Sequence, residues 1–272
     1  MFTNVLAQIG LGYTFLFLLV RARPVIQAST IGVILTGFWL FFFLHGGSEG
    51  LVLPESASHV MEVPFQQWSK NVNAAADVDR WFLNQFPRPG DERFSFNGGG
   101  YHTLNFIPSL ATMILGLMAG QLLMSRRDDW HKLGWLVAGG AVCLLLGVLS
   151  GMFVCPIVKR IWTPSWTLFS GAWVLWTLAL FYLAFDVGRL RRIAFPLVVV
   201  GMNPLTMYMM GQLLRGWLIR NLTIHGGGIT SGVAGGLGMS EMTRGQFMPL
   251  CQYTAAFIVM WLICSIWILR CC

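Results

Sequence analysis

Long apolar runs constrain this chain more than any other feature, because about 20 apolar residues in a helix cross the hydrocarbon core of a bilayer. Seven such runs alternate with segments that hold most of the charged residues. Only 11% of the 272 residues are charged, whereas a soluble domain carries about 25%. Backbone groups find no water inside a lipid bilayer, so these runs are expected to be helices. The sequence therefore predicts an all-α, polytopic membrane protein built as a helical bundle.

Residues 1–272 are expected to form one transmembrane domain with two long connecting segments. These are an extracytoplasmic loop at 45–104 and a glycine-rich loop at 221–249. Within the first, "AAADVDRWFLNQF" (Ala74–Phe86) predicts a short amphipathic helix at the membrane surface. The seven predicted spans are Val5–Val20, Val25–Leu44, Asn105–Met124, Leu133–Val154, Trp166–Asp186, Phe195–Trp217 and Leu250–Leu269.

Basic residues concentrate in alternate connections, which predicts the orientation. The connections after the first, third and fifth spans and the C-terminus are basic, so the positive-inside rule places them in the cytoplasm. Met1 then lies outside, and the first span begins within a few residues of it with no basic segment between them. This is a poor signal for an outside N-terminus, so we expect the natural chain to begin earlier. The net charge of +7 reflects these helix-end residues, so we predict a lipid bilayer and no nucleic acid as the partner.

The six cysteines show no CxxC or Cys/His metal spacing, so no metal site is predicted.

The polar stretch "FNGGGYHTLNF" contains the first candidate site. His102 is of a type that serves as acid or base near neutral pH, and Asn105 could bind substrate beside it. The alternative is a glycine-rich entry turn with an exposed histidine, and the pattern alone favours that alternative.

The predicted span Phe195–Trp217 is unusually polar. Pro204 frees a backbone carbonyl, and Asn203 and Gln212 are candidate substrate-binding groups in a cavity wall. A kinked packing helix is the alternative interpretation. Elsewhere, Asn4, Gln8 and Gln121 are expected to make interhelical hydrogen bonds.

The stretch "KRIWTPSWTLFS" lies between two predicted spans. Thr163 is suited to cap the next helix and Pro164 to begin it, while Trp162 and Trp166 suit a membrane interface. We interpret it as a structural corner rather than a catalytic element.

Four stretches, in this order, resemble the family of heparan-α-glucosaminide N-acetyltransferase and its bacterial relatives. They are "NVLAQIGLGY", "IPSLATMILGLMAGQLL", "KRIWTPSWTLFSGAW" and "FPLVVVGMNPLTMYMMGQLL". The resemblance implies a multi-pass enzyme of the inner membrane that transfers acetyl from cytoplasmic acetyl-CoA, as co-substrate, to an extracytoplasmic amino sugar or glycan. The family's His-containing motif, which precedes the "NVLAQIGLGY" equivalent, is not found here, so His102 remains a candidate from the residues alone.

Such an enzyme needs basic residues on its cytoplasmic side to bind the CoA phosphates. The candidates are Arg126, Arg127, Arg191 and Arg192, although orientation signals explain these arginines as well. Two other functions stay open: a multi-pass transporter, and an inactive paralogue with a binding or structural role. The sequence also leaves a homodimer open as a partner arrangement.

Overall fold

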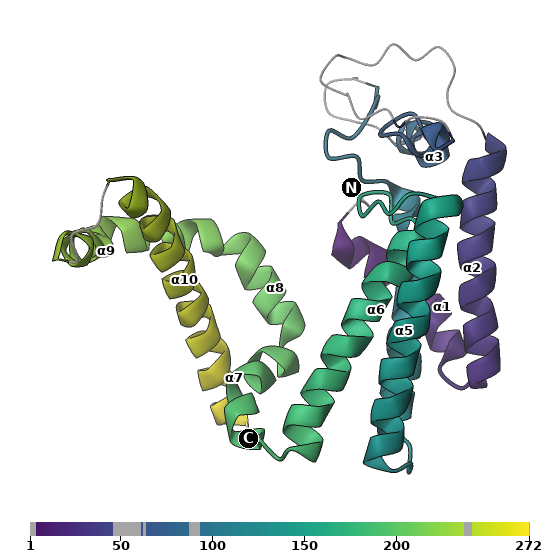
Figure 1. The fold of residues 1–272 in the computed structure, drawn as a ribbon. Coiled ribbons are helices and arrows are strands. Elements are labelled where there is room, and N and C mark those ends of the chain that lie inside the picture. The colour runs from purple at the N-terminus through teal and green to yellow at the C-terminus, as the bar shows by residue number, and fades with distance from the viewer. Residues whose placement is uncertain (1–3, 46–60, 62–63, 87–92, 237–240, 272) are drawn as a thin grey trace. The chain divides into compact units, whose positions relative to one another are not determined.

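A computed structural model describes residues 4–45, 61, 64–86, 93–236 and 241–271 of the chain. Every regular element in these ranges is a helix (Figure 1), which confirms the all-α prediction. The chain separates into two compact units, Met1–Val187 and Gly188–Cys272. Each is described by itself below, and the expectation of a single domain stays a prediction.

The described residues of the first unit form five long helices and three short ones. The long helices are α1 Val5–Leu19, α2 Pro24–His45, α4 Phe106–Met124, α5 Asp129–Phe153 and α6 Pro164–Phe181, the last continued by the π-helical turn η4 Tyr182–Val187. The short helices are η2 Gln66–Trp68, α3 Ala74–Leu83 and η3 Thr103–Asn105. α3 is the predicted amphipathic helix, shorter by three residues at its end.

Side-chain caps explain where several of these helices begin. Asn4, Asn73, Asp128 and Thr163 each accept a hydrogen bond from a backbone N–H of the following first turn. Such caps satisfy N–H groups that have no partner within the helix. Thr163 was predicted as a cap, and Pro164 is indeed the first residue of α6.

Small residues bring α5 and α6 together, and the two run side by side (Figure 1). A Cβ atom at Gly147 would lie 2.6 Å from the backbone nitrogen of Phe169. At Gly140 the Trp176 indole occupies the space that a Cβ atom would need. The indole N–H donates to the Val137 carbonyl at 3.1 Å. Close approach of this kind holds helices together in lipid, where burial of apolar surface gives little driving force.

α1 and α2 both contact α4. Ile31 and Leu35 of α2 pack on Leu110, Ala111 and Ile114 of α4, and Leu16 and Leu19 of α1 pack against the same cluster. Polar bonds add to this packing. Ser109 Oγ donates to Gln8 Oε1 at 3.0 Å, and Gln121 Nε2 donates to the Val20 carbonyl at 2.8 Å. The interhelical bonds predicted for Gln8 and Gln121 are thus confirmed. The one for Asn4 is wrong, because its Oδ1 is used to cap α1.

The second unit contains α7 Arg191–Met202, α8 Pro204–Leu213, α9 Arg215–Gly236 and α10 Glu241–Cys271. α7 and α8 meet at an angle of 69° with Asn203 between them. The predicted break at Pro204 is therefore confirmed, and it is a sharp bend. The segment 221–249 was expected to be a glycine-rich loop, but α9 continues into it as far as Gly236. Glycine weakens a helix by only about 1 kcal/mol per residue, and no proline stops this one.

Five helical segments are long and apolar enough to cross a membrane: Pro24–His45, Thr103–Met124, Asp129–Phe153, Pro164–Val187 and Met248–Ile266. The bent pair α7–α8 makes a sixth if it is a single span. α1 has only 15 residues and is shorter than the others. Among the described residues the chain therefore has five or six candidate spans, and the predicted count of seven is not confirmed.

Candidate functional site

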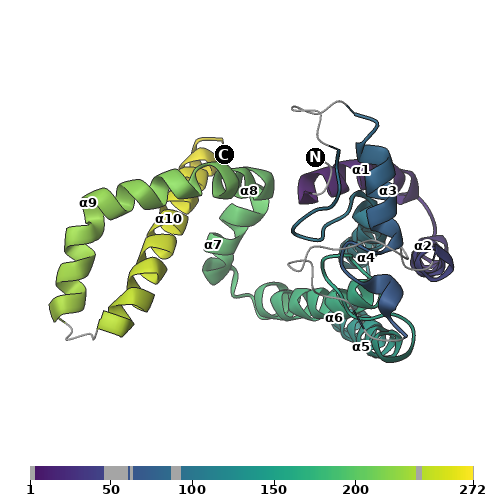
Figure 2. The same ribbon diagram turned by 90° about the horizontal axis from the view of Figure 1, so that it is seen from above.

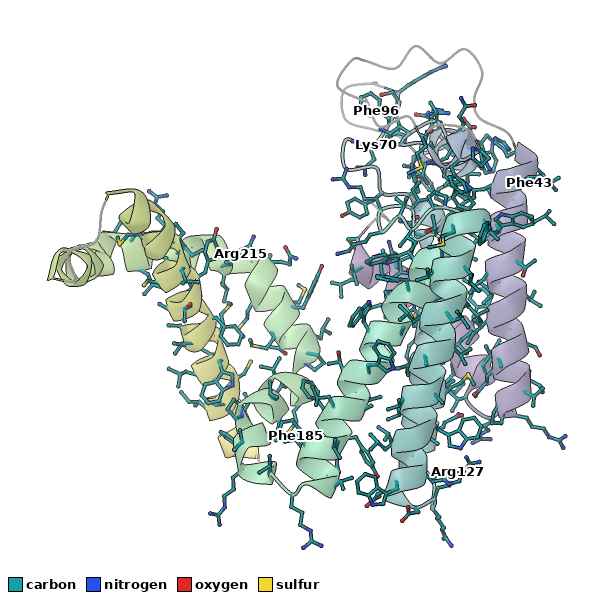
Figure 3. The ribbon with its side chains drawn as sticks, in the orientation of Figure 1. Phe43, Lys70, Phe96, Arg127, Phe185 and Arg215 are labelled. Carbon is teal, nitrogen blue, oxygen red and sulfur yellow. The ribbon has the colours of Figure 1, made fainter. Side chains whose placement is uncertain are left out.

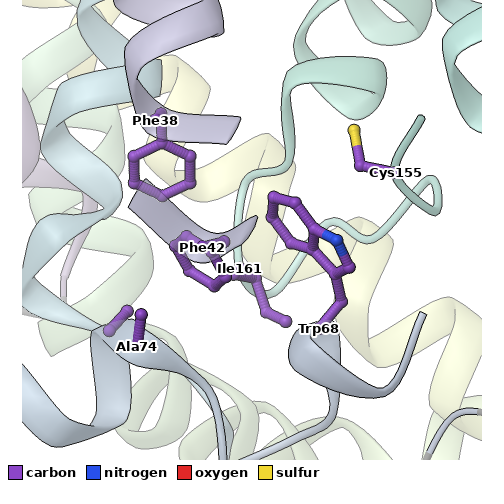
Figure 4. Close-up of a cluster of buried hydrophobic side chains, with 7 residues drawn as sticks. Phe38, Phe42, Trp68, Ala74, Cys155 and Ile161 are labelled. Carbon is purple, nitrogen blue, oxygen red and sulfur yellow. The ribbon is translucent and has the colours of Figure 1, made fainter. Parts of the chain in front are cut away.

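Buried polar side chains gather at one end of the first unit, in the region we call the head. The head comprises the described residues from Met61 to Asn105 together with residues 154–167. There α3 contacts the end of α2 and η3 (Figures 1 and 2). An apolar cluster anchors it, in which Trp68 stacks on Phe42 with ring centroids 4.4 Å apart (Figure 4). Ala74, Cys155 and Ile161 complete the contact between the segments (Figure 4).

His102 lies inside the head, paired with Asp79 of α3. Its Nδ1 lies 3.3 Å from Asp79 Oδ2, and the exposed fractions of the two side chains are 2% and 1%. The backbone N–H of Thr103 also donates to the carboxylate, at 3.2 and 3.1 Å from its two oxygens. The expectation of an exposed histidine is therefore wrong. The backbone turns inward at η3 because Asp79 holds both the ring and the following amide.

The partner of Nδ1 determines what His102 can do. In a neutral imidazole, an Nδ1–H that donates to the Asp79 carboxylate leaves the lone pair on Nε2. Nε2 is buried and has no hydrogen-bond partner among the described residues. A carboxylate that orients a histidine in this way is the arrangement that general bases use. The geometry therefore suits proton acceptance at Nε2.

Asn105 lies at the end of η3 and is fully buried. Its Nδ2 donates to the backbone carbonyl of Arg160 at 2.7 Å, which ties η3 to the turn before α6. Its Oδ1 has no partner in the described part of the chain. Nδ2 already donates one of its two hydrogens, and the unpartnered Oδ1 can accept from an N–H or O–H group of a substrate.

The turn before α6 is held by its own polar groups. Thr163 Oγ1 accepts hydrogen bonds from the Val158 and Trp166 N–H groups, at 3.1 and 3.3 Å. Ser165 Oγ donates to the carbonyls of Cys155 and Pro156, at 2.8 and 2.9 Å. Burial raises the pKa of the Cys155 thiol, an effect that its hydrogen bond to Ser165 only partly offsets. The thiol is therefore a packing group rather than a nucleophile.

Trp162 in this turn has a positive φ of 56°. A bulky side chain in this conformation costs on the order of 1–2 kcal/mol and persists only where surrounding contacts impose it. Here they include the Trp162 indole N–H, which donates to Thr112 Oγ1 at 3.3 Å. The strain lies next to Arg160 and Ile161, which line a cavity.

The cavity has a volume of about 340 Å³. It lies between η2, the glycine turn before His102 and the turn before α6. Its lining residues are Met61, Trp68, Lys70, Gly100, Val158, Arg160 and Ile161. A volume of this size is at the lower end of the range for small-molecule pockets, about 300–1,000 Å³.

Buried polar atoms without a partner are concentrated in the head. Within the described ranges, they include Trp68 Nε1, Asn71 Oδ1, His102 Nε2, Thr103 Oγ1 and Asn105 Oδ1. Folded proteins pair nearly all such atoms, so a cluster of exceptions needs an explanation. A binding site for a polar ligand is one explanation that also accounts for the adjoining cavity.

The other sequence candidates lie elsewhere. Arg126 and Arg127 follow α4 at the end opposite to the head, so Lys70 and Arg127 mark the two ends of the first unit (Figure 3). Both arginines are exposed, and Arg127 lies over the Trp135 ring at 5.9 Å. Arg192, Asn203 and Gln212 belong to the second unit, where Gln212 and Arg192 are exposed and Asn203 is half-buried at the helix break. The side chain of Arg191 lies outside the described residues.

Sequence reasoning missed Asp79, although a signal was present. Ala75, Asp79 and Leu83 are spaced four residues apart and therefore share one face of α3. An acid on the apolar face of an amphipathic helix is expected to be buried with a partner. Among the described residues, no group of three or more His, Cys, Asp or Glu side chains could hold a metal ion.

Comparison with known proteins gives no relative for this chain. No family model, no curated protein and no solved structure matches it.

Proposed function

We propose that the protein is a membrane-bound acyltransferase that moves acetyl from cytoplasmic acetyl-CoA to an extracytoplasmic amino sugar or glycan. The single observation that carries the proposal is the buried His102 imidazole, oriented by Asp79 and with Nε2 unpartnered. The four sequence stretches that resemble membrane acetyltransferases support the same reaction class. In this proposal the chain crosses the inner membrane seven times, α1 included, with the head outside and the C-terminus in the cytoplasm.

The proposed chemistry assigns one proton transfer to His102. The amine nitrogen of the acceptor attacks the acetyl carbonyl carbon of the thioester, forming a C–N bond. His102 Nε2 takes the proton that the nitrogen loses, and the C–S bond breaks as the tetrahedral intermediate collapses. The proton then passes to the CoA thiolate, so the products are the N-acetyl sugar and free CoA. Asn105 Oδ1 accepts from the second N–H of the amine and orients it.

The positions of the candidate residues set two conditions on this proposal. Nε2 is buried, so the acceptor reaches it only after a neighbouring side chain moves. Arg126 and Arg127 follow a helix of 19 residues, which at about 1.5 Å per residue spans roughly 28 Å. If these arginines hold the CoA phosphates, the thioester arm must extend along α4 toward the head.

The test is acetyl transfer by the full chain in nanodiscs of neutral phosphatidylcholine. Labelled acetyl-CoA is supplied with glucosamine, and labelled N-acetylglucosamine is measured. In His102→Asn the amide nitrogen replaces Nδ1 and keeps the bond to Asp79, while the group at Nε2 is lost. We expect at least about a hundredfold loss of turnover, the usual contribution of a general base. His131→Asn changes an exposed histidine outside the head and is the control.

Equal turnover in His102→Asn and the wild type would overturn the assignment of the base. Failure of the wild type to bind acetyl-CoA would overturn the reaction class.

A transporter is the second candidate, because the 69° break between α7 and α8 places Asn203 at a helix end. Transporters use this arrangement for substrate sites. A transporter moves labelled amino sugar into proteoliposomes without binding acetyl-CoA.

A further inference from the structure

The cavity of the head is lined by two cations that have no counter-ion in the part of the chain that the structure describes. Lys70 and Arg160 both line it, and neither makes a salt bridge or a side-chain hydrogen bond with any described residue. The described carboxylates of the head are committed elsewhere. Asp77 pairs with His45 and Arg80, and Asp79 pairs with His102. Within the described ranges, no carboxylate therefore compensates the positive charge of this cavity.

Lys70 is held over the cavity rather than free in solvent. It is half-buried, and its aliphatic stem packs against the turn at Gly100. A Cβ atom on Gly100 would lie 3.1 Å from Lys70 Cγ and Cε, and the φ of Gly100 is +70°. Glycine is suited to both requirements, since it has no Cβ and adopts positive φ at no steric cost. The turn thus holds the Lys70 side chain at the cavity.

The third polar side chain in the wall is also a donor. Trp68 lines the cavity, and its indole N–H is buried with no partner among the described residues. Lysine, arginine and the indole ring supply donors and no acceptor. Oxyanions are the complementary ligands, because they accept several hydrogen bonds and neutralise the cations.

We propose that this cavity is a binding site for an oxyanion, a phosphate or carboxylate group, held by Lys70 and Arg160 with Trp68 in its wall. The anionic group belongs either to a soluble small molecule or to the headgroup of an anionic lipid. The site adjoins the candidate base, because Gly100 precedes His102 by two residues and Asn105 bonds the Arg160 carbonyl. Its extension to acetyl transfer rests on the proposed function: an anionic group held here would place the rest of an acceptor near His102.

The experiment measures binding of inorganic phosphate to the full chain in nanodiscs of neutral phosphatidylcholine, without acetyl-CoA. Binding is followed by broadening of the phosphate ³¹P resonance. We expect saturable broadening for the wild type and at least about a tenfold weaker affinity for Lys70→Gln and Arg160→Gln. Lys70→Arg keeps the charge and is expected to retain binding. Lys159→Gln removes a neighbouring exposed lysine that does not line the cavity, and it is expected to bind as the wild type does.

Two results would overturn the proposal: unchanged binding in the double variant Lys70→Gln/Arg160→Gln, or an equal loss in Lys159→Gln, which would indicate nonspecific surface charge. If Lys70→Gln does not fold, Arg160→Gln decides alone, because Arg160 is exposed and its replacement does not disturb packing. Nanodiscs that contain phosphatidylglycerol distinguish a soluble anion from a lipid headgroup as the natural ligand. Weaker phosphate binding there assigns the site to a lipid headgroup, and unchanged binding assigns it to a soluble anion. Because acetyl-CoA is omitted, this result is independent of the acetyltransferase test.

Discussion

The head and the membrane shaft of the first unit are held together by different forces. We call the shaft the parts of α1, α2, α4, α5 and α6 outside the head. Buried polar side chains of the shaft are few: Gln8, Gln27 and Ser109. Those of the head are Ser69, Asn71, Asn73, Asp79, His102, Thr103, Asn105, Thr163, Ser165 and Thr167. The shaft relies on apolar packing, with small residues bringing α5 and α6 together, whereas the head adds many specific hydrogen bonds to its apolar cluster.

The physical reason is the difference in surroundings. Lipid-facing helices satisfy their own backbone groups, so they need only pack. The head contains turns and short helices whose backbone groups require side-chain partners. Its fold is therefore sensitive to single polar substitutions, and the same polar groups make it the place where chemistry is expected.

The largest expected effect is that of Asp79→Ala in the head. It leaves the His102 ring and the Thr103 N–H buried without their acceptor, so we expect a loss of about 3 kcal/mol of unfolding free energy. Thermal unfolding in detergent micelles measures it. Asp186→Ala removes an exposed carboxylate of the first unit and is expected to change stability by less than about 0.5 kcal/mol. Similar losses for both would contradict the role given to the pair.

Gly147→Ala tests the shaft, with a somewhat smaller expected effect. The added methyl group meets the α6 backbone at Phe169, so the helices must separate, at a cost of about 1–3 kcal/mol. Gly134→Ala in the same helix is the matched control, because a Cβ there has no neighbour within 4 Å. Alanine should stabilise α5 slightly at that position. If the two variants unfold at the same temperature, close packing of α5 and α6 does not hold the shaft together.

Thr163→Val removes a hydroxyl that accepts two backbone N–H groups in the head. Valine has nearly the same shape, so the loss of about 1–2 kcal/mol is due to the two unpaired donors. Thr177→Val, in the helix that Thr163 caps, removes a hydroxyl that donates only to the Trp173 carbonyl one turn earlier. We expect that control to keep the wild-type melting temperature. A greater loss in Thr177→Val would reverse the comparison between head and shaft.

The smallest effect is expected for a polar bond inside the shaft. Ser109→Ala removes the hydrogen bond to Gln8, and interhelical bonds in membranes contribute about 0.6 kcal/mol on average. Chemical unfolding in mixed micelles resolves a difference of this size when Ser29→Ala, an exposed site on α2, is measured in parallel. A loss as large as that of Asp79→Ala would show that the shaft also depends on polar bonds.

The amino-acid sequence by itself determined the helical class, the approximate helix positions, the Thr163 cap and the break at Pro204. These are local properties, because hydrophobic run length, cap chemistry and proline sterics act within a few residues. The polar stretch around His102 was also identified locally, but its burial was not, since a glycine-rich turn gives no sign of what covers it.

Only the tertiary structure joined Asp79 to His102, which are 23 residues apart, and Asn105 to Arg160, which are 55 apart. Such pairs depend on how α3, η3 and the turn before α6 pack on one another, and no local pattern specifies that packing. The same holds for the cavity, whose two cations come from segments separated in the sequence by α3, η3, α4 and α5. The sequence shows which residues are charged. The fold decides whether a charged side chain has a partner and which one it is.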